Sequence, residues 1–384
     1  MRIRLRDIAD EIRNTYVPNP EDDLPYIGLE YVEPGSLHIS GIGSSREVES
    51  HKFKFRTGDI LFSTLRPYFR KVVIAPCDGV CSTEFCVVRP KQDSDRYFVF
   101  YGMAHPQFIK FATTNSKGAR PRTKWKLFSG YELPEFLSPR RRDMGSILST
   151  YDNLIENNRR RIQLLEAAAR LLYKEWFVHL RFPGHEHVKI TRGVPDGWER
   201  KVLGDVCFEV RETVDPKSLE PNTPYIGLEH MPRRSIALAD WDYAEKVTSS
   251  KHRFREGEIL FGKIRPYFHK VGIALTDGIA SSDAIVIRPA SSQLLALVLM
   301  TTSSDGFIAV TAQQMKEGSK MPRADWKQMQ QYPLPQPPEG ILRAFNGFIE
   351  PILTQLKTLS FSNRQLNAAR DLLLPRLMNG EVAV

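Results

Sequence analysis

Short runs of apolar residues, each bounded by Gly, Pro or Asp, dominate two large parts of the chain. Ile60-Leu61-Phe62, Val72-Val73-Ile74-Ala75 and Phe85-Cys86-Val87-Val88 are of this kind. Apolar runs of this length between turn-forming residues are typical of β-strands. The longer apolar stretches 97–111 and 294–310 favour helices. The pattern therefore predicts an α+β fold, with strands and helices mixed in each domain.

Two other stretches carry mostly apolar residues at alternating spacings of four and three, which is the spacing of a coiled-coil seam. Each seam includes one Asn, a buried polar residue of the kind that fixes helix register. Gly347, Pro351 and Pro375 are expected to kink or delimit the second helix. The first series is Tyr151, Ile155, Asn158, Ile162, Leu165, Ala169, Leu172 and Trp176; the second is Phe345, Ile349, Ile352, Leu356, Leu359, Asn363, Leu366, Arg370, Leu373 and Leu377.

Either seam alone fits an amphipathic helix packed on its own domain. Two seams in corresponding places favour pairing of the two helices with each other. Residues 151–176 form a rod of about 39 Å at 1.5 Å per residue. Since one turn of B-form DNA is about 34–36 Å long, such a rod has the length to hold two domains one turn apart on a duplex.

The chain contains a duplication. Residues 25–90 align without a gap with residues 224–289, and 30 of the 66 positions are identical. Pro25-Tyr26-Ile27-Gly28-Leu29-Glu30 returns as Pro224-Tyr225-Ile226-Gly227-Leu228-Glu229, and Arg66-Pro67-Tyr68-Phe69 returns as Arg265-Pro266-Tyr267-Phe268. A period near 200 residues is too long for a solenoid, so each copy is expected to be a domain with its own core.

These patterns divide the chain into four parts. We expect a first mixed domain at residues 1–139, a helical region at 140–182, a second mixed domain at 183–338 and a second helical region at 339–384. The predicted fold is two homologous α+β domains joined by two long helices that form an antiparallel coiled coil.

Composition narrows the class of protein. Lys and Arg total 54 against 45 Asp and Glu, a net charge of +9 that favours a polyanionic partner such as nucleic acid. The charged N-terminus and the lack of a 20-residue apolar run predict a cytoplasmic protein that does not bind membranes. Four cysteines are too few for a disulfide scaffold, and we expect no metal site.

Catalytic motifs are absent from the sequence. It has no phosphate-binding loop, and Pro335-Gln336-Pro337-Pro338 lacks the Asn or Asp and the aromatic residue of an adenine methyltransferase turn. Asp196, Glu199 and Lys201 are too close together to hold Mg²⁺ as a nuclease does. His185-Glu186-His187 is interpreted as part of a solvated linker. The chain is therefore expected to be non-catalytic and to bind no cofactor.

Binding chemistry recurs in both copies. Short segments combine guanidinium groups, aromatic rings and lysines, which suit contacts with phosphates and base edges. The alternative is a structural scaffold with incidental basic charge, which a weak salt dependence of DNA binding would support. The predicted DNA-binding residues are Arg66, Tyr68, Arg70, Lys71, Lys117, Arg120, Arg122, Lys124, Arg265, Tyr267, His269, Lys270, Lys320 and Arg323.

Three segments of the chain, together with the order of its four parts, point to a known family. The segments are Asp152-Asn153-Leu154-Ile155-Glu156-Asn157-Asn158-Arg159-Arg160, Val194-Pro195-Asp196-Gly197-Trp198-Glu199 and Ala369-Arg370-Asp371-Leu372-Leu373-Leu374-Pro375-Arg376-Leu377-Met378-Asn379-Gly380-Glu381. In these segments and in their order, the chain resembles the specificity (S) subunit of type I restriction–modification systems. Two departures concern helix starts: Pro338-Glu339-Gly340 replaces the usual entry to the second helix, and the first domain lacks the Pro-x-Gly-Trp-Glu lead-in.

The resemblance implies a non-catalytic subunit that binds double-stranded DNA at a bipartite, asymmetric target. It implies two modification subunits, which carry S-adenosylmethionine and methylate adenine, docked on the helices. It also implies a restriction subunit that uses ATP. The seam residues listed above would then hold the helices together and support these partners.

Overall fold

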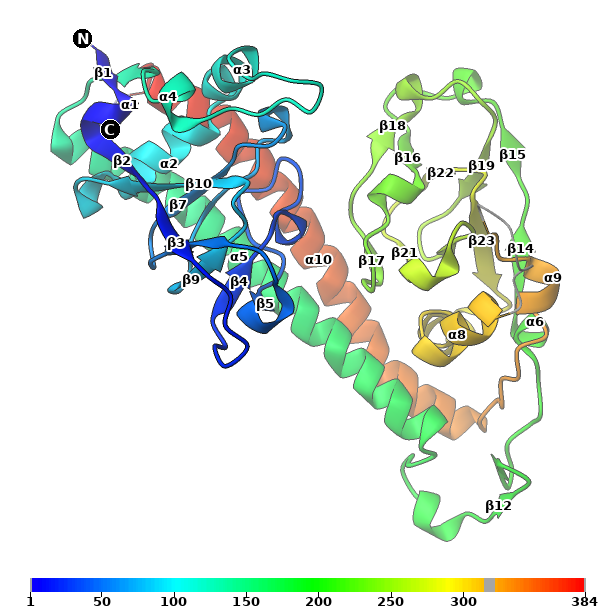
Figure 1. Cartoon of the computed structure of the whole chain (residues 1–384). Helices are drawn as coiled ribbons and strands as arrows, with labels where there is room; N and C mark the ends of the chain where they lie inside the picture. Colours follow the sequence, from blue (N-terminus) through cyan, green and yellow to red (C-terminus); the bar gives the residue numbers. More distant parts are fainter. Residues whose placement is uncertain (1, 314–321, 383–384) are drawn as a thin grey trace. The chain divides into compact units, whose positions relative to one another are not determined.

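The computed structural model describes residues 2–313 and 322–382. The chain divides into two units, of which unit 1 is Met1–Asn157 with Arg364–Val384, and unit 2 is Asn158–Asn363. Each unit contains one copy of the repeat and part of each of two long helices, α5 (Ser138–Tyr173) and α10 (Glu339–Met378) (Figure 1). The boundary between the two units crosses both long helices. The division into four parts given above therefore stays a prediction.

Two β-sheets form the mixed domain of unit 1. A four-stranded antiparallel sheet has the order β2-β10-β7-β8, and a five-stranded sheet has the order β3-β6-β9-β4-β5 with β4 and β9 parallel. The short strands β1 and β11 pair separately. The strands are β1 (Arg2–Arg4), β2 (Ala9–Ile12), β3 (Asn14–Tyr16), β4 (Pro25–Ile27), β5 (Gly43–Ser44), β6 (Lys52–Phe55), β7 (Ile60–Ser63), β8 (Val72–Ile74), β9 (Gly79–Cys81), β10 (Phe85–Pro90) and β11 (Glu132–Pro134).

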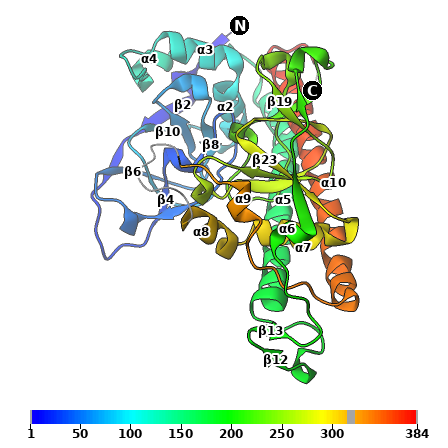
Figure 2. The ribbon, with the colours of Figure 1, turned by 90° about the vertical axis from the view of Figure 1, so that its right-hand side faces the viewer.

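The four-stranded sheet is buried on both faces, which explains its unbroken apolar runs. Ile60 and Phe62 of β7 pack into one core cluster with helices α2 (Arg96–Ala104) and α3 (Pro106–Thr114). Leu61, between them, points to the other face and belongs to a second cluster with residues of the five-stranded sheet. Figure 2 shows α2 beside this sheet. The remaining helices of the domain are the single turns α1 (Leu5–Ile8) and α4 (Trp125–Phe128).

Unit 2 repeats this architecture. Its two sheets have the orders β14-β23-β20-β21-β17 and β15-β19-β22-β16-β18, so β17 is an additional strand at the edge of the first sheet. The strands are β12 (Ile190–Thr191), β13 (Val194–Pro195), β14 (Cys207–Val210), β15 (Thr213–Val214), β16 (Pro224–Ile226), β17 (Ala237–Leu238), β18 (Asp242–Tyr243), β19 (Lys251–Phe254), β20 (Ile259–Gly262), β21 (Val271–Ala274), β22 (Gly278–Ala280) and β23 (Ala284–Pro289). The helices are α6 (Leu203–Val206), α7 (Leu295–Thr302), α8 (Asp305–Gln313) and α9 (Trp326–Met329).

The helical stretches expected at 97–111 and 294–310 are each two helices. In unit 1, α2 ends before His105, and Pro106 begins α3 because proline suits the first helical position, where no N–H is needed. In unit 2, the carbonyls at the end of α7 are capped at Ser303, and α8 begins at Asp305. Apolar periodicity carries across both breaks, which is why the sequence pattern did not separate the helices.

The two long helices pair antiparallel in each unit, and the predicted fold class is confirmed. In unit 1, Arg370 of α10 meets Asp152 of α5. In unit 2, Asn158 donates from Nδ2 to Asn363 Oδ1 at 3.0 Å, and the ring of Trp176 contacts that of Phe345. Of the predicted seam residues, Ile155, Trp176, Leu356, Leu359 and Asn363 are buried, and Tyr151, Asn158, Ile162, Leu165, Leu366 and Leu373 are half-buried.

The helix α10 runs unbroken from Glu339 to Met378, so Gly347, Pro351 and Pro375, which were expected to kink or delimit it, do not end the helix. Gly347 and Pro351 are both exposed on the helix surface. A proline leaves the carbonyl four residues earlier without its helical partner, and at an exposed position water can take that bond. The packed seam then keeps the helix continuous.

Over the described residues, no individual helix is both long and apolar enough to cross a bilayer. Only Ser292–Thr302 and Asp305–Gln313 taken together reach that threshold, and they are bent by 64°.

Candidate nucleic-acid interface

A tight turn carries the repeated Arg-Pro-Tyr-Phe segment in each unit. In unit 1, a 3₁₀ turn (Pro67–Phe69) is flanked by Arg66 and Arg70, both in the left-handed region with φ of 50°. Non-glycine residues rarely adopt this conformation, which costs about 1–3 kcal/mol and persists where the surroundings impose it. The turn presents Tyr68 to solvent with 48% of its surface exposed.

The same turn recurs in unit 2, where a 3₁₀ turn (Pro266–Phe268) lies between two left-handed residues. Arg265 has φ of 50° and His269 has φ of 55°. Tyr267 is 52% exposed. Both copies therefore keep an unfavourable backbone geometry that displays a tyrosine.

A basic loop, residues 117–124, is joined to the turn of unit 1. The Arg66 amide donates to the Pro121 carbonyl at 2.7 Å, and Leu65 forms a β-bridge with Arg122. Lys117 and Arg122 exchange two backbone hydrogen bonds of 3.0 Å, which close the loop. In this article the turn and the basic loop together are called the turn–loop surface. Its exposed cations are Lys117, Arg120, Arg122 and Lys124.

Unit 2 builds the same junction. The Arg265 amide donates to the Pro322 carbonyl at 2.9 Å, and Ile264 forms a β-bridge with Arg323. Arg265 and Arg323 are exposed. Lys320, predicted to bind DNA, lies outside the described residues. The turn–loop surface of unit 2 is therefore described by residues 265–270 with Pro322 and Arg323.

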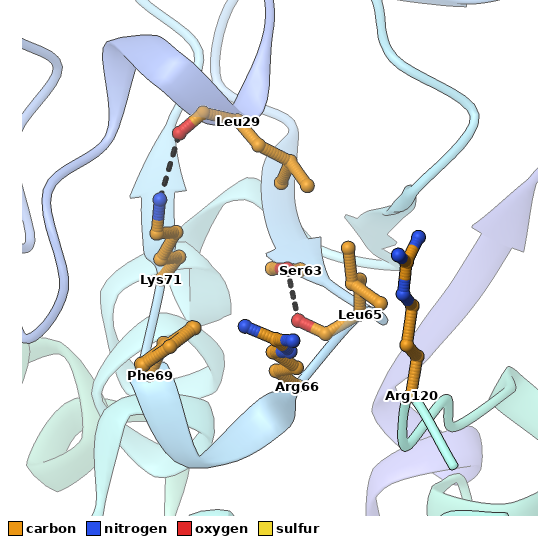
Figure 3. A pocket seen from close by; sticks show the side chains of 7 residues that line it. All are labelled: Leu29, Ser63, Leu65, Arg66, Phe69, Lys71 and Arg120. Carbon is orange, nitrogen blue, oxygen red and sulfur yellow. Dashed lines mark hydrogen bonds between the residues drawn. The ribbon is translucent and has the colours of Figure 1, made fainter. Parts of the chain in front are cut away.

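A pocket of about 320 Å³ opens on the turn–loop surface of unit 1, between the turn and the basic loop (Figure 3). Arg66 and Arg120 flank it, and the Arg66 guanidinium lies 5.8 Å from the centre of the Phe69 ring. Lys71 donates from Nζ to the Leu29 carbonyl at 2.8 Å. The pocket is lined by Leu29, Ser63, Leu65, Arg66, Phe69, Lys71 and Arg120.

Several predicted DNA-binding residues are at least partly buried and contact other parts of their own unit. Lys71 and its counterpart Lys270, which donates to the Leu228 carbonyl, are half-buried, and burial lowers the pKa of both. Arg70 donates from Nε to the Ala104 carbonyl at 2.9 Å. His269 is 4% exposed. These residues hold the turn against neighbouring segments.

His269 takes the place of Arg70 in unit 2 and keeps its contact. Its Nε2 lies 2.8 Å from the Ser303 carbonyl, as Arg70 Nε does from the Ala104 carbonyl. Burial lowers the pKa of His269, so the neutral ring is favoured. With its ring inside the protein, His269 is not part of the exposed turn–loop surface.

Each exposed arginine at the β-bridge has a carboxylate partner that the sequence analysis did not identify. Arg122 donates to both oxygens of Glu84, from Nε at 3.1 Å and from Nη2 at 2.6 Å. Arg323 Nη2 lies 3.3 Å from an oxygen of Asp283. Glu84 and Asp283 occupy equivalent positions of the repeat. An acidic residue at the same position of both copies was the sequence signal that could have identified these partners.

Buried carboxylates of α5 hold each mixed domain to the helices. In unit 1, Asp152 accepts from Tyr101 Oη at 2.5 Å and from Arg370 Nη1 at 2.6 Å, and His38 Nε2 lies 3.4 Å away. Burial alone raises the pKa of Asp152, but the contacts with His38, Arg370 and Tyr101 outweigh burial and lower it below its usual value.

In unit 2, the corresponding carboxylate is Glu166, which is 4% exposed. It accepts from Ser235 Oγ at 2.7 Å and from the amides of Ile236 and Ala237 at 2.9 and 3.3 Å. Residues 36–38 and 235–237 are the same segment of the repeat. In both units, a carboxylate of α5 thus contacts the same loop of the repeat and holds the mixed domain to the helix. The spacing of residues in the sequence did not predict this contact.

That loop also contacts the turn. In unit 1 the Gly35 amide donates to the Phe69 carbonyl at 2.7 Å, and in unit 2 the Arg234 amide donates to the His269 carbonyl at 2.9 Å. In unit 2, hydrogen bonds therefore run from α5 through this loop to the turn that displays the tyrosine. In unit 1 the loop is hydrogen-bonded to the turn, and its link to α5 is the 3.4 Å contact between His38 and Asp152.

Within the described part of the chain, no group of three His, Cys, Asp or Glu side chains is placed to hold a metal ion. His185 and His187 lie in a 3₁₀ turn with Glu186 between them. Cys81, Cys86 and Cys207 are buried, and burial raises the pKa of each thiol.

The chain is similar to known proteins in sequence and in fold. A family model described as a type I restriction modification DNA specificity domain matches residues 1–167. The type I restriction enzyme MjaIX specificity subunit of Methanocaldococcus jannaschii is 23% identical over 348 residues, covering 86% of this chain and 79% of the relative. The EcoDI specificity subunit of Escherichia coli is 26% identical over 150 residues, 38% of this chain and 32% of that one.

A solved structure supports the fold. The crystal structure of a type I restriction–modification system S subunit from M. genitalium aligns with a TM-score of 0.61 at 14% identity. The alignment covers 98% of this chain and 96% of that one. At this level of identity the likeness concerns the fold.

Proposed function

We propose that this chain, which belongs to the family of type I restriction–modification specificity subunits, selects a DNA target that is split into two different half-sites. The observation that carries the proposal is the turn–loop surface, present twice in one chain in non-identical form. Each copy displays a tyrosine beside exposed arginines. Such groups suit contacts with phosphates and base edges.

The differences between the copies support an asymmetric target. Identical domains would read the same sequence twice, whereas these copies differ at 36 of 66 aligned positions. Near the turn, Thr64 is replaced by Lys263 and Arg70 by His269. Each unit then reads its own half-site, and the DNA between the half-sites is not read.

In this proposal the chain itself performs no catalysis. Methylation of adenine, with S-adenosylmethionine, and ATP-dependent restriction belong to partner subunits in the cytoplasm. The specificity subunit brings two modification subunits to the selected site, and a restriction subunit joins them.

An exposed apolar stripe on the helices supports partner docking. Leu164, Leu171 and Val178 recur every seven residues and are 70%, 63% and 57% exposed. Phe348 of α10, which is 57% exposed, contacts the ring of Trp176 in the π-helical turn (Lys174–Val178) that follows α5. Large apolar side chains gathered on one exposed face mark interaction surfaces. We assign this stripe to a modification subunit.

The half-site assignment is tested with arginine variants. Arg122→Ala is expected to weaken binding only to the half-site of unit 1, and Arg323→Ala only to that of unit 2, by about 1–3 kcal/mol for each good base contact. The measurement is equilibrium binding to duplexes altered in one half-site at a time. Arg142→Ala, an exposed change on α5, serves as the control. Equal loss on both half-sites for either variant contradicts separate reading.

The docking assignment is tested with charge on the stripe. The double variant Leu164→Asp and Leu171→Asp is expected to abolish co-purification of the modification subunit, because two buried carboxylates without partners cost several kcal/mol. Gln163→Asp adds one negative charge at an exposed position of the same helix outside the stripe and keeps the complex. Retention of the modification subunit by the double variant, with normal folding by circular dichroism, rejects this assignment.

A further inference from the structure

The paired arginine and carboxylate on each turn–loop surface have a geometry that distinguishes base contacts from phosphate contacts. Arg122 and Glu84 are both accessible, with side chains 50% and 29% exposed, and form a bidentate pair. Both backbones are fixed. The Glu84 carbonyl accepts from the amide and the hydroxyl of Thr64, each at 2.8 Å, and Arg122 is held by the bridge to Leu65. The guanidinium is therefore held in one place and one orientation.

The pair survives divergence of the two copies. Glu84 corresponds to Asp283 at an offset of 199, whereas Arg122 corresponds to Arg323 at an offset of 201, because the basic loops differ in length. Despite that change, Arg323 lies 3.3 Å from Asp283 and keeps its β-bridge to Ile264. The arginine–carboxylate pair is thus kept in both units although the basic loops differ in length, which indicates that the pair has a role of its own.

Charge decides between the two kinds of DNA contact. A carboxylate repels phosphates and offsets the charge of its arginine, so it weakens a phosphate contact. For a base contact, fixed orientation matters more than net charge. Glu84 occupies the Nε and Nη2 edge of Arg122, which leaves the outer Nη1 and Nη2 edge free to donate. Two parallel donors match the O6 and N7 acceptors of guanine in the major groove.

We propose that Arg122 and Arg323 each read a guanine in the half-site bound by their own unit, with Glu84 and Asp283 as positioning residues. The inference rests on the proposed function and names one base in each half of its target. Because Asp283 makes one longer contact where Glu84 makes two short ones, guanine is discriminated more weakly in the half-site of unit 2.

The test uses the full chain with its modification subunits and a pool of randomised duplexes, from which the target is selected. Arg122→Ala is expected to lose the preference for guanine at one position by about five- to 150-fold, and the salt dependence of binding stays unchanged. Replacing that guanine with 7-deazaguanine, which lacks the N7 acceptor, weakens binding of the wild-type protein and has no further effect on Arg122→Ala.

The positioning role has its own readout. Glu84→Ala lowers the preference for guanine at the same position and at the same time raises affinity for nonspecific DNA, because a repulsive charge is removed. Glu84→Asp, which copies the pair of unit 2, retains part of the preference. Glu135→Ala removes an exposed carboxylate elsewhere in unit 1 and leaves the preference at that position unchanged.

The outcomes separate the two proposals. If Arg122→Ala weakens all sequences alike and the salt slope falls by about one, the contact is to phosphate and the guanine inference is wrong. If the wild-type complex selects no sequence from the pool, the proposed function itself fails.

Discussion

Arg370→Ala is expected to lower the free energy of unfolding by about 3–5 kcal/mol, since removing one partner of a buried ion pair leaves the other charge without compensation. Arg370 is 3% exposed and donates from Nη1 to Asp152 Oδ1 at 2.6 Å, and from Nη2 to Asp371 at 3.0 Å. Asp152 would keep only Tyr101 and His38 as near polar neighbours. Urea denaturation followed by circular dichroism measures the change.

The control for this variant is Arg376→Ala, an exposed change on the same helix, which should alter stability by no more than about 0.5 kcal/mol. Acid provides a second check. Because the pKa of Asp152 is lower in the folded protein than its usual value, its contribution is present above about pH 4 and is lost as the pH falls toward the folded pKa. Arg370→Ala should reduce this acid dependence, because His38 and Tyr101 remain beside Asp152. A variant as stable as Arg376→Ala would mean that the ion pair does not hold unit 1 together.

The second large effect concerns helix length. Duplicating residues 155–161 in α5 and residues 359–365 in α10 adds one heptad to each helix and repeats both Asn158 and Asn363. Seven residues add about 10.5 Å of helix, and a base pair adds about 3.4 Å, so the preferred DNA spacer should lengthen by about three base pairs. Selection from duplexes with spacers of different length measures this preference.

A heptad inserted in α5 alone is the matched control. It moves Asn158 away from Asn363, places polar groups against apolar seam positions and is expected to destabilise the helix pair. An unchanged spacer preference in the double insertion would show that the helices do not set the separation of the half-sites.

The repeat and the two periodicities predicted most of the fold. A short apolar run between turn-forming residues depends on local residue order alone, so Ile60-Leu61-Phe62 could be predicted as a strand. The seam was readable for the same reason, including Asn158 and Asn363, whose hydrogen bond the structure describes. Helix ends were less predictable, because His105 and Ser303 interrupt stretches whose apolar spacing continues.

The candidate site was predicted from basic and aromatic residues that recur in both copies. The sequence did not show which of these side chains are exposed. Nothing in the sequence distinguishes Arg122 on the surface from Arg70, which folds back on the Ala104 carbonyl. Arg66, which has the left-handed conformation, donates its amide to Pro121 of the basic loop, a contact between residues distant in sequence. The Glu84 partner of Arg122 and the docking carboxylates Asp152 and Glu166 depend on the same kind of long-range contact.

The division of the chain between the units sets an order of assembly. Unit 2 is the continuous segment Asn158–Asn363, whereas unit 1 is completed only by Arg364–Val384. On the ribosome, the sheets of the first-made unit must wait, with Asp152 lacking Arg370 and Leu148 lacking the helix that covers it, until the second unit has been synthesised. A chain truncated between Asn363 and Arg370 keeps the whole of unit 2 but lacks these contacts of unit 1, and an incompletely packed unit is expected to be degraded by proteases.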